Sequence, residues 1–175
     1  NSIGDYTVKG LDLLINKQLK NLSSWVSYSY SKNNYFFPEL NFGNAFPNNA
    51  DITHALSFAS TYSLGKLKMA LGTNWRSGKP YTKPTAQQPL SESFISYDEP
   101  NNLNLPDYFR MDLSATYKLE LGEDIESTAG FSLWNVLDRK NIINIYYVRD
   151  ESQNISKVEN FSLGLTPNFS LRVTF

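Results

Sequence analysis

The sequence ends with a stretch that alternates apolar and polar residues, Asn168-Phe169-Ser170-Leu171-Arg172-Val173-Thr174-Phe175. A period of two puts Phe169, Leu171, Val173 and Phe175 on one face of a β-strand. Pro167 is expected just before this strand, where a missing N–H costs little. Such a strand suits a half-buried soluble sheet. It equally suits the closing strand of an outer-membrane barrel, with lipid on one side and the lumen on the other. Assembly machinery reads a strand by pairing along its edge, so the four apolar residues are a candidate assembly signal.

Composition excludes several classes of protein. The 175 residues carry Lys+Arg 16 against Asp+Glu 17, a formal net charge of -1, so no nucleic-acid-binding surface is expected. With no Cys and a single His, neither a disulfide framework nor a thiolate metal site is expected. Mean hydropathy is -0.40, and no run approaches the ~20 apolar residues of a spanning helix. The first residues do not form a signal peptide, so we expect a mature, trimmed or fragmentary chain.

The alternation continues through the chain and predicts an all-β, antiparallel protein of about seven strands. The expected strands are residues 6–19, 22–31, 54–62, 67–76, 108–119, 125–134 and 168–175. Three connections are short, including turns at 63–66 and 122–124. Three are long, and we expect residues 32–53 and 77–106 to be irregular loops. Residues 135–166 are expected to rise as a ribbon that bends near 151–154. Short turns on one rim and long loops on the other are typical of a bacterial outer-membrane barrel.

The strand over residues 108–119 has the cleanest pattern. Its odd-numbered residues, from Phe109 to Leu119, form one face without a charge. A charge at mid-depth on a lipid face would cost roughly 2–4 kcal/mol, whereas the second face of a soluble sandwich has no such restriction. The polar faces of this strand and of residues 67–76 are expected to point into the lumen with their charges, Lys68, Arg76, Arg110, Asp112 and Lys118.

An odd count of strands makes the first and last strands run in the same direction. Single-chain bacterial barrels have an even number of strands, at least eight. The count therefore predicts that residues 1–175 are part of a larger barrel.

Four segments together resemble TonB-dependent outer-membrane receptors. These are Val8-Lys9-Gly10-Leu11-Asp12, Arg76-Ser77-Gly78-Lys79-Pro80-Tyr81-Thr82, Leu105-Pro106-Asp107-Tyr108-Phe109-Arg110-Met111-Asp112-Leu113 and Asn135-Val136-Leu137-Asp138-Arg139-Lys140-Asn141. The terminal Phe175 fits the same family. The segment Asn141-Ile142-Ile143-Asn144-Ile145-Tyr146-Tyr147 looks like receptors of the Bacteroidetes type.

The resemblance implies a 22-stranded barrel around an N-terminal plug, of which residues 1–175 are the C-terminal part. It implies active import of a scarce nutrient across the outer membrane of a Gram-negative bacterium, with energy relayed by TonB and without enzymatic chemistry or a cofactor. The cargo would be an iron chelate, cobalamin or a glycan. The implied partners are outer-membrane lipid, the rest of the barrel and its plug, TonB through the N-terminal part, the barrel-assembly machinery and, for some cargoes, a surface lipoprotein.

Two sets of residues are candidates for ligand contact. Loop aromatics would stack on a sugar or a chelate, or pack only on one another; these are Tyr35, Phe36, Phe37, Tyr81 and Tyr97. The lumen charges line a transport path or, as we favour, form a network that holds the strands or the plug in register. His54 and Asp51 with a serine would be parts of a hydrolase triad, but a polar residue at a strand mouth is the better interpretation.

Two alternatives remain at this point. One is a small standalone outer-membrane barrel that acts as a passive pore or a structural protein. The other is a soluble β-sandwich that binds carbohydrate.

Overall fold

We describe the fold from a computed structural model that covers residues 3–86, 88, 94–120 and 125–174. Phe175 of the candidate assembly signal and the predicted turn at 122–124 lie outside these residues. Seven long strands pair in the order β1-β2-β4-β5-β8-β9-β12, all antiparallel, as the alternation predicts. Their bounds are β1 Asp5–Gln18, β2 Leu22–Phe36, β4 His54–Leu64, β5 Leu67–Arg76, β8 Tyr108–Glu120, β9 Glu126–Trp134 and β12 Thr166–Thr174.

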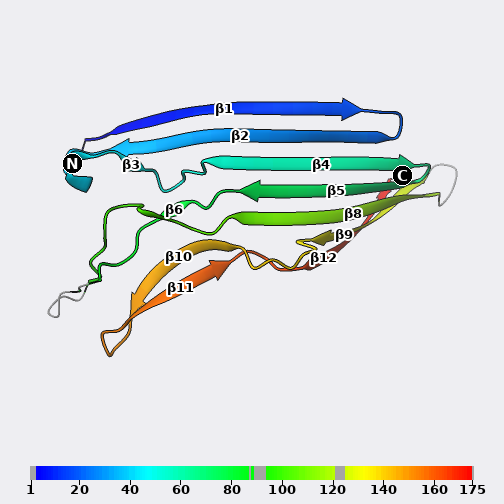
Figure 1. The fold of residues 1–175 in the computed structure, drawn as a ribbon. Coiled ribbons are helices and arrows are strands. Elements are labelled where there is room, and N and C mark those ends of the chain that lie inside the picture. The colour runs from blue at the N-terminus through cyan, green and yellow to red at the C-terminus, as the bar shows by residue number, and fades with distance from the viewer. Residues whose placement is uncertain (1–2, 87, 89–93, 121–124, 175) are drawn as a thin grey trace.

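The two rims of the sheet differ. In Figure 1 the short connections β1–β2 and β4–β5 and the end of β8 lie at the right, and the long connections lie at the left. The chain ends at the right-hand rim, where β12 finishes. This arrangement is the one predicted from the alternation of short and long connections.

The long connections are more ordered than expected. The prediction of an irregular loop over residues 32–53 is wrong at its start, because β2 continues to Phe36, and in its interior, where the two-residue strand β3, Phe46–Pro47, pairs with β2. Its end is correct, because β4 begins at His54. Between them lies a short 3-10 turn, η1, Asn41–Gly43. In the second long connection β6, Pro80–Tyr81, pairs with β7, Leu103–Asn104. The third forms the predicted ribbon, β10 Ile142–Arg149 and β11 Ile155–Phe161, which turns at residues 150–154.

The register confirms the division of the sheet into two faces. Directly opposed residues share a face, and Leu71, Leu113 and Leu133 stand in one row across three strands. Phe169 and Phe131 face each other across β12 and β9, with Ala115 next in the same row. The polar residues form equivalent rows on the other side. Charges on the apolar side occur only near the ends of β1 and β2.

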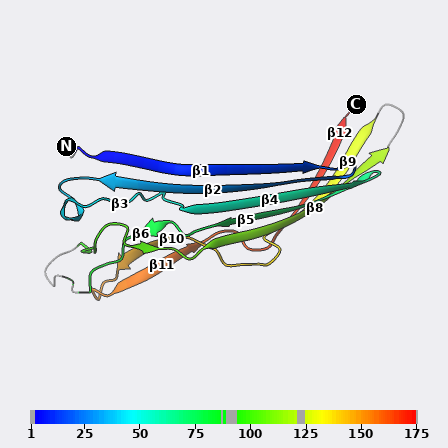
Figure 2. The same ribbon diagram turned by 45° about the horizontal axis from the view of Figure 1, so that its top comes forward.

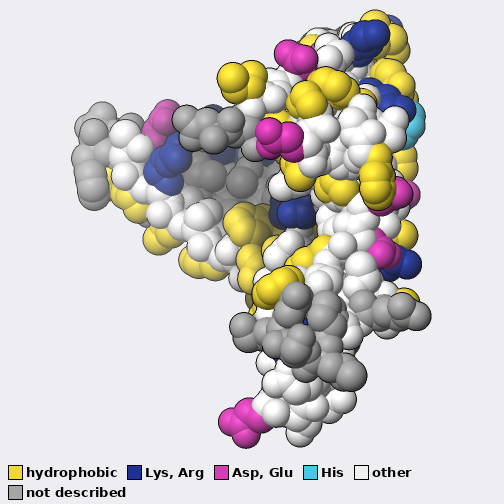
Figure 3. Space-filling model, turned by 90° about the vertical axis from the view of Figure 1, so that its left-hand side faces the viewer, with side chains coloured by type: hydrophobic (Ala, Val, Ile, Leu, Met, Phe, Trp, Pro, Cys, Tyr) yellow, Lys and Arg dark blue, Asp and Glu magenta, His cyan; other side chains and the backbone are white. Residues whose placement is uncertain are grey.

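The apolar face is not covered by another layer. The contacts between elements join hydrogen-bonded neighbours, and the described residues hold no second sheet stacked on the first. Leu113 is 45%, Phe131 50% and Phe169 74% exposed. Seen from the rim of the long loops, hydrophobic side chains lie along the margins of the molecule (Figure 3). A soluble sandwich would bury this face, so that alternative is wrong, and a lipid-facing wall accounts for the exposure.

The height of the apolar face fits a bilayer. Trp75 and Phe109 stand opposite each other near the long-loop rim, and Leu67 and Tyr117 near the other rim. From Phe109 to Tyr117 the strand rises about 27 Å, at ~3.4 Å for each step between residues. A strand tilt of ~40° reduces this span to about 21 Å, close to the ~25 Å apolar band of such barrels.

The sheet is strongly twisted and open. In Figure 2 β9 and β12 rise steeply away from the plane of β1 and β2, in keeping with the twist of antiparallel sheets. β1 and β12 are its edge strands. Pro167 lies inside β12, opposite Leu133, and not before the strand as expected. An edge strand accepts a proline whose missing N–H would point away from its neighbour.

No helix in the described part of the chain is long and apolar enough to cross a membrane.

Candidate functional site

The polar face of the sheet is the hollowed one. A hollow of about 310 Å³ near the long-loop rim is lined by the polar-face residues Ser57, Asn74, Arg76, Tyr108 and Arg110, among others. A second, of about 190 Å³, lies over Ser114, Thr116, Ser132 and Ser170. These hollows and their hydroxyl, amide and guanidinium groups make this face suited to polar solutes.

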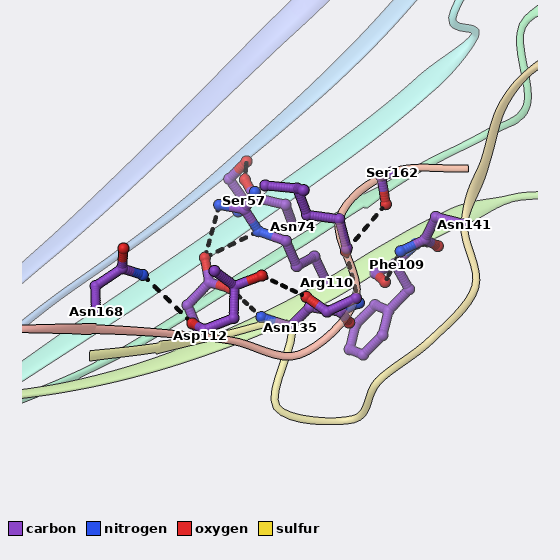
Figure 4. A network of polar contacts seen from close by, with 12 residues as sticks. Ser57, Asn74, Phe109, Arg110, Asp112, Asn135, Asn141, Ser162 and Asn168 are labelled. Carbon is purple, nitrogen blue, oxygen red and sulfur yellow. Dashed lines mark hydrogen bonds and ion pairs between the residues drawn. The ribbon is translucent and has the colours of Figure 1, made fainter. Parts of the chain in front are cut away.

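Arg110 and Asp112 form the ion pair at the centre of this face. They lie two residues apart on β8, so their side chains point the same way. Asp112 Oδ2 accepts hydrogen bonds from Arg110 Nη2 at 2.7 Å and Nε at 3.0 Å. Asp112 Oδ1 accepts a further bond, 2.9 Å, from the backbone N–H of Asn135. Figure 4 shows Arg110 and Asn135 both directed at Asp112. The carboxylate therefore joins β8 to the segment that follows β9.

The other predicted lumen charges do not join this pair. The Arg76 guanidinium lies 4.7 Å from the centre of the Tyr108 ring, a cation–π contact. Lys68 stands opposite Thr116, and Lys118 opposite Thr128. Among the described residues neither lysine takes part in an ion pair. The expected network of five charges is thus wrong in extent, because Lys68 and Lys118 lie toward the short-turn rim, far along the strands from Arg110.

Two asparagines complete the edge of β8 where β9 leaves it. β9 pairs with β8 only as far as Leu113. Beyond that point the side chain of Asn141 takes the place of a neighbouring strand. Its Oδ1 accepts the N–H of Phe109 at 2.9 Å, and its Nδ2 donates to the carbonyl of Phe109 at 2.8 Å. Figure 4 shows the amide beside Phe109.

Asn135 holds the same corner from its other side. Its Nδ2 donates to the carbonyls of Arg139 and Leu163, at 3.0 and 3.1 Å. The backbone N–H of Val136 donates to the carbonyl of Met111, 2.8 Å, so β8 keeps its hydrogen bonds. Asn135 is 1% and Asn141 2% exposed. The family-like segment over residues 135–141 signalled this corner, but the partners of its amides lie too far away in the sequence to be predicted.

The aromatic residues of the first long connection pack mainly on one another. The Tyr35 ring lies 5.7 Å from that of Phe37 and 6.0 Å from that of Phe46, between ring centres. Tyr35 and Phe36 lie on β2 and not in a loop, because the strand extends beyond its predicted end. Phe36 points to the opposite side of β2 from Tyr35. The self-packing interpretation therefore accounts for the positions of Tyr35 and Phe37.

Phe42 is an aromatic residue of the same long connection, and the structure sets it apart from the others. It is 90% exposed at the tip of the first long connection, with φ at 53°. A bulky residue in the left-handed region is uncommon, and such strain gathers at functional positions. The sequence identifies Phe42 as a loop aromatic but holds no signal for its backbone angle.

A second aromatic cluster joins the other two long connections. The Tyr97 and Tyr147 rings meet edge to face, 6.5 Å between centres. Arg149 Nη2 donates to the carbonyl of Phe94 at 3.1 Å and to Gln88 Oε1 at 3.3 Å. The ribbon β10–β11 thus supports the loop that carries Tyr81 and Tyr97.

Partial burial and neighbouring polar groups shift the pKa values of two side chains in and beside this cluster, Tyr147 and Lys157. Burial raises the pKa of the Tyr147 hydroxyl, and its hydrogen bond with Tyr81 raises it further, while Lys157 acts in the opposite direction. The Lys157 ammonium pairs with Glu159 at 2.5 Å, and that hydrogen bond raises the pKa of Lys157. The Tyr147 hydroxyl therefore stays neutral near pH 7 and can serve as a hydrogen-bond donor and acceptor.

His54 belongs to an aromatic belt on the apolar face. Its Nδ1 lies 2.8 Å from the hydroxyl of Tyr28, and its ring lies 5.4 Å from that of Tyr30 and 6.5 Å from that of Trp75. Asp51 is engaged elsewhere, accepting the N–H of Asn33 at 2.9 Å. A triad through His54 and Asp51 is not formed. Within the described ranges, no group of three or more His, Cys, Asp or Glu residues is arranged to hold a metal ion.

The described residues of the candidate assembly signal lie on the apolar face of β12. Phe169, Leu171 and Val173 alternate with polar residues and stand opposite Phe131, Ala129 and Ser127 of β9. The other edge of β12 has no neighbour in the sheet. The row is thus accessible both to lipid and to a strand that pairs along this edge.

These features define an all-β segment of a membrane-spanning barrel, apolar outside, polar inside, with long loops on one rim. A scan against protein-family models matches residues 1–136 to the family described as "TonB dependent receptor-like, beta-barrel". The match covers most of the chain, and the chain belongs to this family. Comparisons with curated proteins and with solved structures find no match.

Membership in this family has direct consequences. Its members are outer-membrane transporters and receptors of Gram-negative bacteria, not enzymes. The family implies a plug domain, TonB and membrane lipid as partners. The hollowed polar face is then the inner wall of a receptor barrel.

Proposed function

We propose that this chain is the C-terminal part of the barrel of a receptor that imports a scarce nutrient with energy relayed by TonB. The plug and the segment that contacts TonB belong to another part of the same polypeptide. The Bacteroidetes-like ribbon over residues 141–147 favours a glycan, an iron chelate or cobalamin as cargo, and a surface lipoprotein as an accessory for glycan capture.

The observation that carries this proposal is the direction of the two edge strands. Six antiparallel pairings lead from β1 to β12, so the two edges run the same way. An antiparallel barrel closes only between edges that run in opposite directions, which requires an odd number of further strands. A small barrel made of these seven strands alone would need one parallel closing pair.

The geometry supports two separate roles along the transport path, ligand contact at the long-loop rim and lining of the lumen. Tyr81 and Tyr97, on the loops supported by β10–β11, are proposed to contact the ligand at the long-loop rim. Arg110 and Asp112, with Arg76, Lys68 and Lys118, are proposed to line the lumen and to hold the plug in register. The cargo passes when the plug rearranges, without chemistry on the cargo.

The final strand is proposed to be the signal for the barrel-assembly machinery. Phe169, Leu171 and Val173 supply the apolar row, and the unpaired edge of β12 supplies the backbone groups for pairing. Phe175 follows this row in the sequence. Deletion of Phe175 should slow insertion of the barrel into outer membranes. Insertion at the rate of the unaltered receptor would refute this role.

The first test of the transport proposal is the intact mass of the polypeptide in outer membranes. We expect several times the 19.9 kDa of these residues. A mass of 19.9 kDa would overturn the proposal and favour a passive barrel. Uptake of labelled glycans, iron chelates and cobalamin, with and without TonB, then identifies the cargo.

The ligand-contact proposal has a matched control. Tyr97 is 48% exposed at the long-loop rim, and Tyr117 is 46% exposed on the apolar face near the other rim. Tyr97→Ala should weaken cargo binding, whereas Tyr117→Ala should leave it unchanged. Equal binding by both variants would refute the contact.

A further inference from the structure

Asn101 is a buried residue of the second long connection, which joins β5 to β8. Its Nδ2 donates to the carbonyl of Pro47 at 2.7 Å and to Oδ1 of Asn49 at 2.5 Å. These partners lie 54 and 52 positions earlier, in the first long connection. Asn101 is 8% exposed, so its amide is largely shielded from water. Because an amide has two donor hydrogens, this single side chain engages two acceptors of the other connection at once.

The backbone of Asn101 requires a residue of this type. Its φ is 57°, in the left-handed region that asparagine, aspartate and glycine accept more readily than other residues. Pro100 precedes it, and proline followed by a residue of positive φ is typical of a tight turn. Asparagine therefore meets two demands at this position. Aspartate and glycine would accept the same φ, but neither has the amide donor.

The partners of Asn101 are fixed to the barrel wall. The N–H of Asn48, which lies between them, donates to the carbonyl of Asn33 on β2 at 2.9 Å. The N–H of Asn33 in turn donates to Oδ1 of Asp51 at 2.9 Å. Asn48 is 7% and Asp51 6% exposed. Through these bonds Asn101 is tied to β2 and not to a freely moving loop.

Asn101 also holds the two sides of its own connection together. Its backbone N–H donates to Oγ1 of Thr82 at 2.8 Å, directly after β6. Further along, the N–H of Asp98 donates to the carbonyl of Lys83 at 3.0 Å. Tyr81 and Tyr97, the proposed ligand contacts, lie on these two sides. The residue that links the first two connections is thus part of the segment that carries both tyrosines.

The third long connection joins the same assembly. The Tyr97 ring meets that of Tyr147 on β10, and Arg149 Nη2 donates to the carbonyl of Phe94 at 3.1 Å. In Figures 1 and 2, β3, β6, β10 and β11 all lie at the same end of the molecule. A continuous series of contacts therefore runs from β2 through residues 47–49 and Asn101 to the ribbon β10–β11.

We propose that Asn101 is a positioning residue that holds the three long connections as one preformed platform. On this platform Tyr81 and Tyr97 are in place before cargo arrives. Contact residues that are already ordered bind with a smaller entropic cost, and the fraction of receptors in the binding-competent arrangement sets the apparent affinity. The inference rests on the proposed function only for the role of the two tyrosines as cargo contacts.

The first test is hydrogen exchange of the complete receptor. Asn101→Asp keeps the size of the side chain and tolerates the positive φ, but it presents an oxygen to the two acceptors of the first connection. Amides of residues 48–51 and 97–98 should exchange about tenfold faster, because the joined connections open together once the link is lost. The N–H of Val136, bonded to the carbonyl of Met111 on the wall, should be unchanged. Unchanged exchange, or acceleration in only one connection, would overturn the platform.

Two further variants separate the amide from charge and backbone effects. Asn102 is exposed and adjacent, so Asn102→Asp adds the same charge and should leave exchange unchanged. Asn101→Gly keeps the positive φ without adding a charge and should match Asn101→Asp. Acceleration by Asn102→Asp equal to that by Asn101→Asp, or normal exchange in Asn101→Gly, would overturn the role of the amide. The heat-dependent shift in gel mobility confirms that each variant is a folded barrel.

The second test distinguishes positioning from cargo contact. The probes are cyanocobalamin, ferric citrate and a labelled maltooligosaccharide, and the one that the unaltered receptor takes up is used for binding kinetics. Asn101→Asp should lower the association rate about tenfold and leave the dissociation rate unchanged, since fewer receptors are binding-competent at any moment. Saturating probe should restore the maximal uptake rate. Tyr97→Ala should instead raise the dissociation rate.

The outcomes separate this inference from the proposed function. A raised dissociation rate in Asn101→Asp, with a normal association rate, would overturn the positioning role. Normal binding by Tyr97→Ala, together with faster exchange in Asn101→Asp, would refute the proposed contact and leave the platform standing. If the receptor binds none of the three probes, the proposed cargo classes are at fault, and hydrogen exchange alone decides the inference.

Discussion

The two faces of β8 present the same strand to two different solvents. On one face Phe109, Leu113 and Tyr117 stand opposite apolar residues of the neighbouring strands, and no other part of the described chain covers them. On the other, Arg110 and Asp112 are joined by an ion pair and lie in or beside a hollow lined by polar groups. The two faces belong to one strand and share its backbone geometry. The difference therefore shows that the surroundings of each face determine which residue types it carries. Lipid excludes charge from one face, and the barrel interior requires partners for charge on the other.

The largest expected effect comes from moving a charge from one face to the other. Leu113 lies midway between Phe109 and Tyr117, at the middle of the apolar face. Leu113→Arg should destabilise the folded barrel by roughly 2–4 kcal/mol and block its assembly, because it places a guanidinium in mid-bilayer. Assembly is measured by the heat-dependent gel mobility of the receptor in outer membranes.

The neighbouring residue is the matched control for this change. Ser114 points to the polar face, beside a hollow of about 190 Å³. Ser114→Arg should assemble normally, because the guanidinium would meet water and polar side chains. Equal assembly of the two variants would show that the faces are assigned incorrectly.

The sequence was sufficient to assign the two faces of the sheet, because lipid requires one of them to be apolar. In the membrane-spanning part apolar and polar residues largely alternate, and the strands, their order and their directions follow from this pattern. Beyond the membrane the pattern weakens, because water surrounds both sides of an extended ribbon. The polar run Lys32-Asn33-Asn34 therefore looked like a loop, although β2 continues through it to Phe36. For the same reason β6 and β7 carried no signal.

The candidate site was less accessible to prediction for a different reason. Arg110 and Asp112 were recognised because they lie two residues apart on one strand. The contacts of Asn135 with Leu163, and of Asn141 with Phe109, join residues about 30 positions apart. No periodicity encodes such pairings. They are required because β9 leaves β8 early and the backbone groups left behind must be satisfied.

Removal of the Asn141 amide tests how much the corner formed by Asn135 and Asn141 contributes to the stability of the barrel. Asn141→Ala leaves both the N–H and the carbonyl of Phe109 without their partners. An unsatisfied buried polar group costs about 1–3 kcal/mol, so the free energy of unfolding should fall by that order. Denaturant titration of the receptor in lipid vesicles measures it.

The control lies three residues further along the chain. Asn144 is exposed on β10, and its side chain makes no hydrogen bond within the described residues. Asn144→Ala should therefore unfold as the unaltered receptor does. A cost for Asn144→Ala equal to that for Asn141→Ala would contradict the role of the corner.

A smaller effect on stability is expected at Asp112, where two variants distinguish the contribution of the charge from that of the hydrogen bonds. Asp112→Ala removes the partner of Arg110 and the acceptor of the Asn135 N–H, and should destabilise the receptor by about 1–2 kcal/mol. Asp112→Asn keeps an acceptor for Asn135 and should cost less, because an ion pair at this level of exposure contributes at most about 1 kcal/mol. Equal losses in the two variants, measured by the same titration, would mean that the charge dominates.

The smallest effect is expected at the short-turn rim, outside both faces. The Lys66 ammonium lies 2.7 Å from Glu120, and this hydrogen bond raises the pKa of Lys66 above its usual 10.5. A raised lysine pKa stabilises the fold at pH values below 10.5 and ceases to do so as the pH rises through the folded value. Both groups are exposed to water, which screens their attraction. Lys66→Ala should therefore leave the thermal midpoint unchanged at pH 8, and the variant and the unaltered receptor should also agree at pH 11. A lower midpoint for the variant at pH 8 alone would show that this rim contributes to stability as the two faces of the wall do.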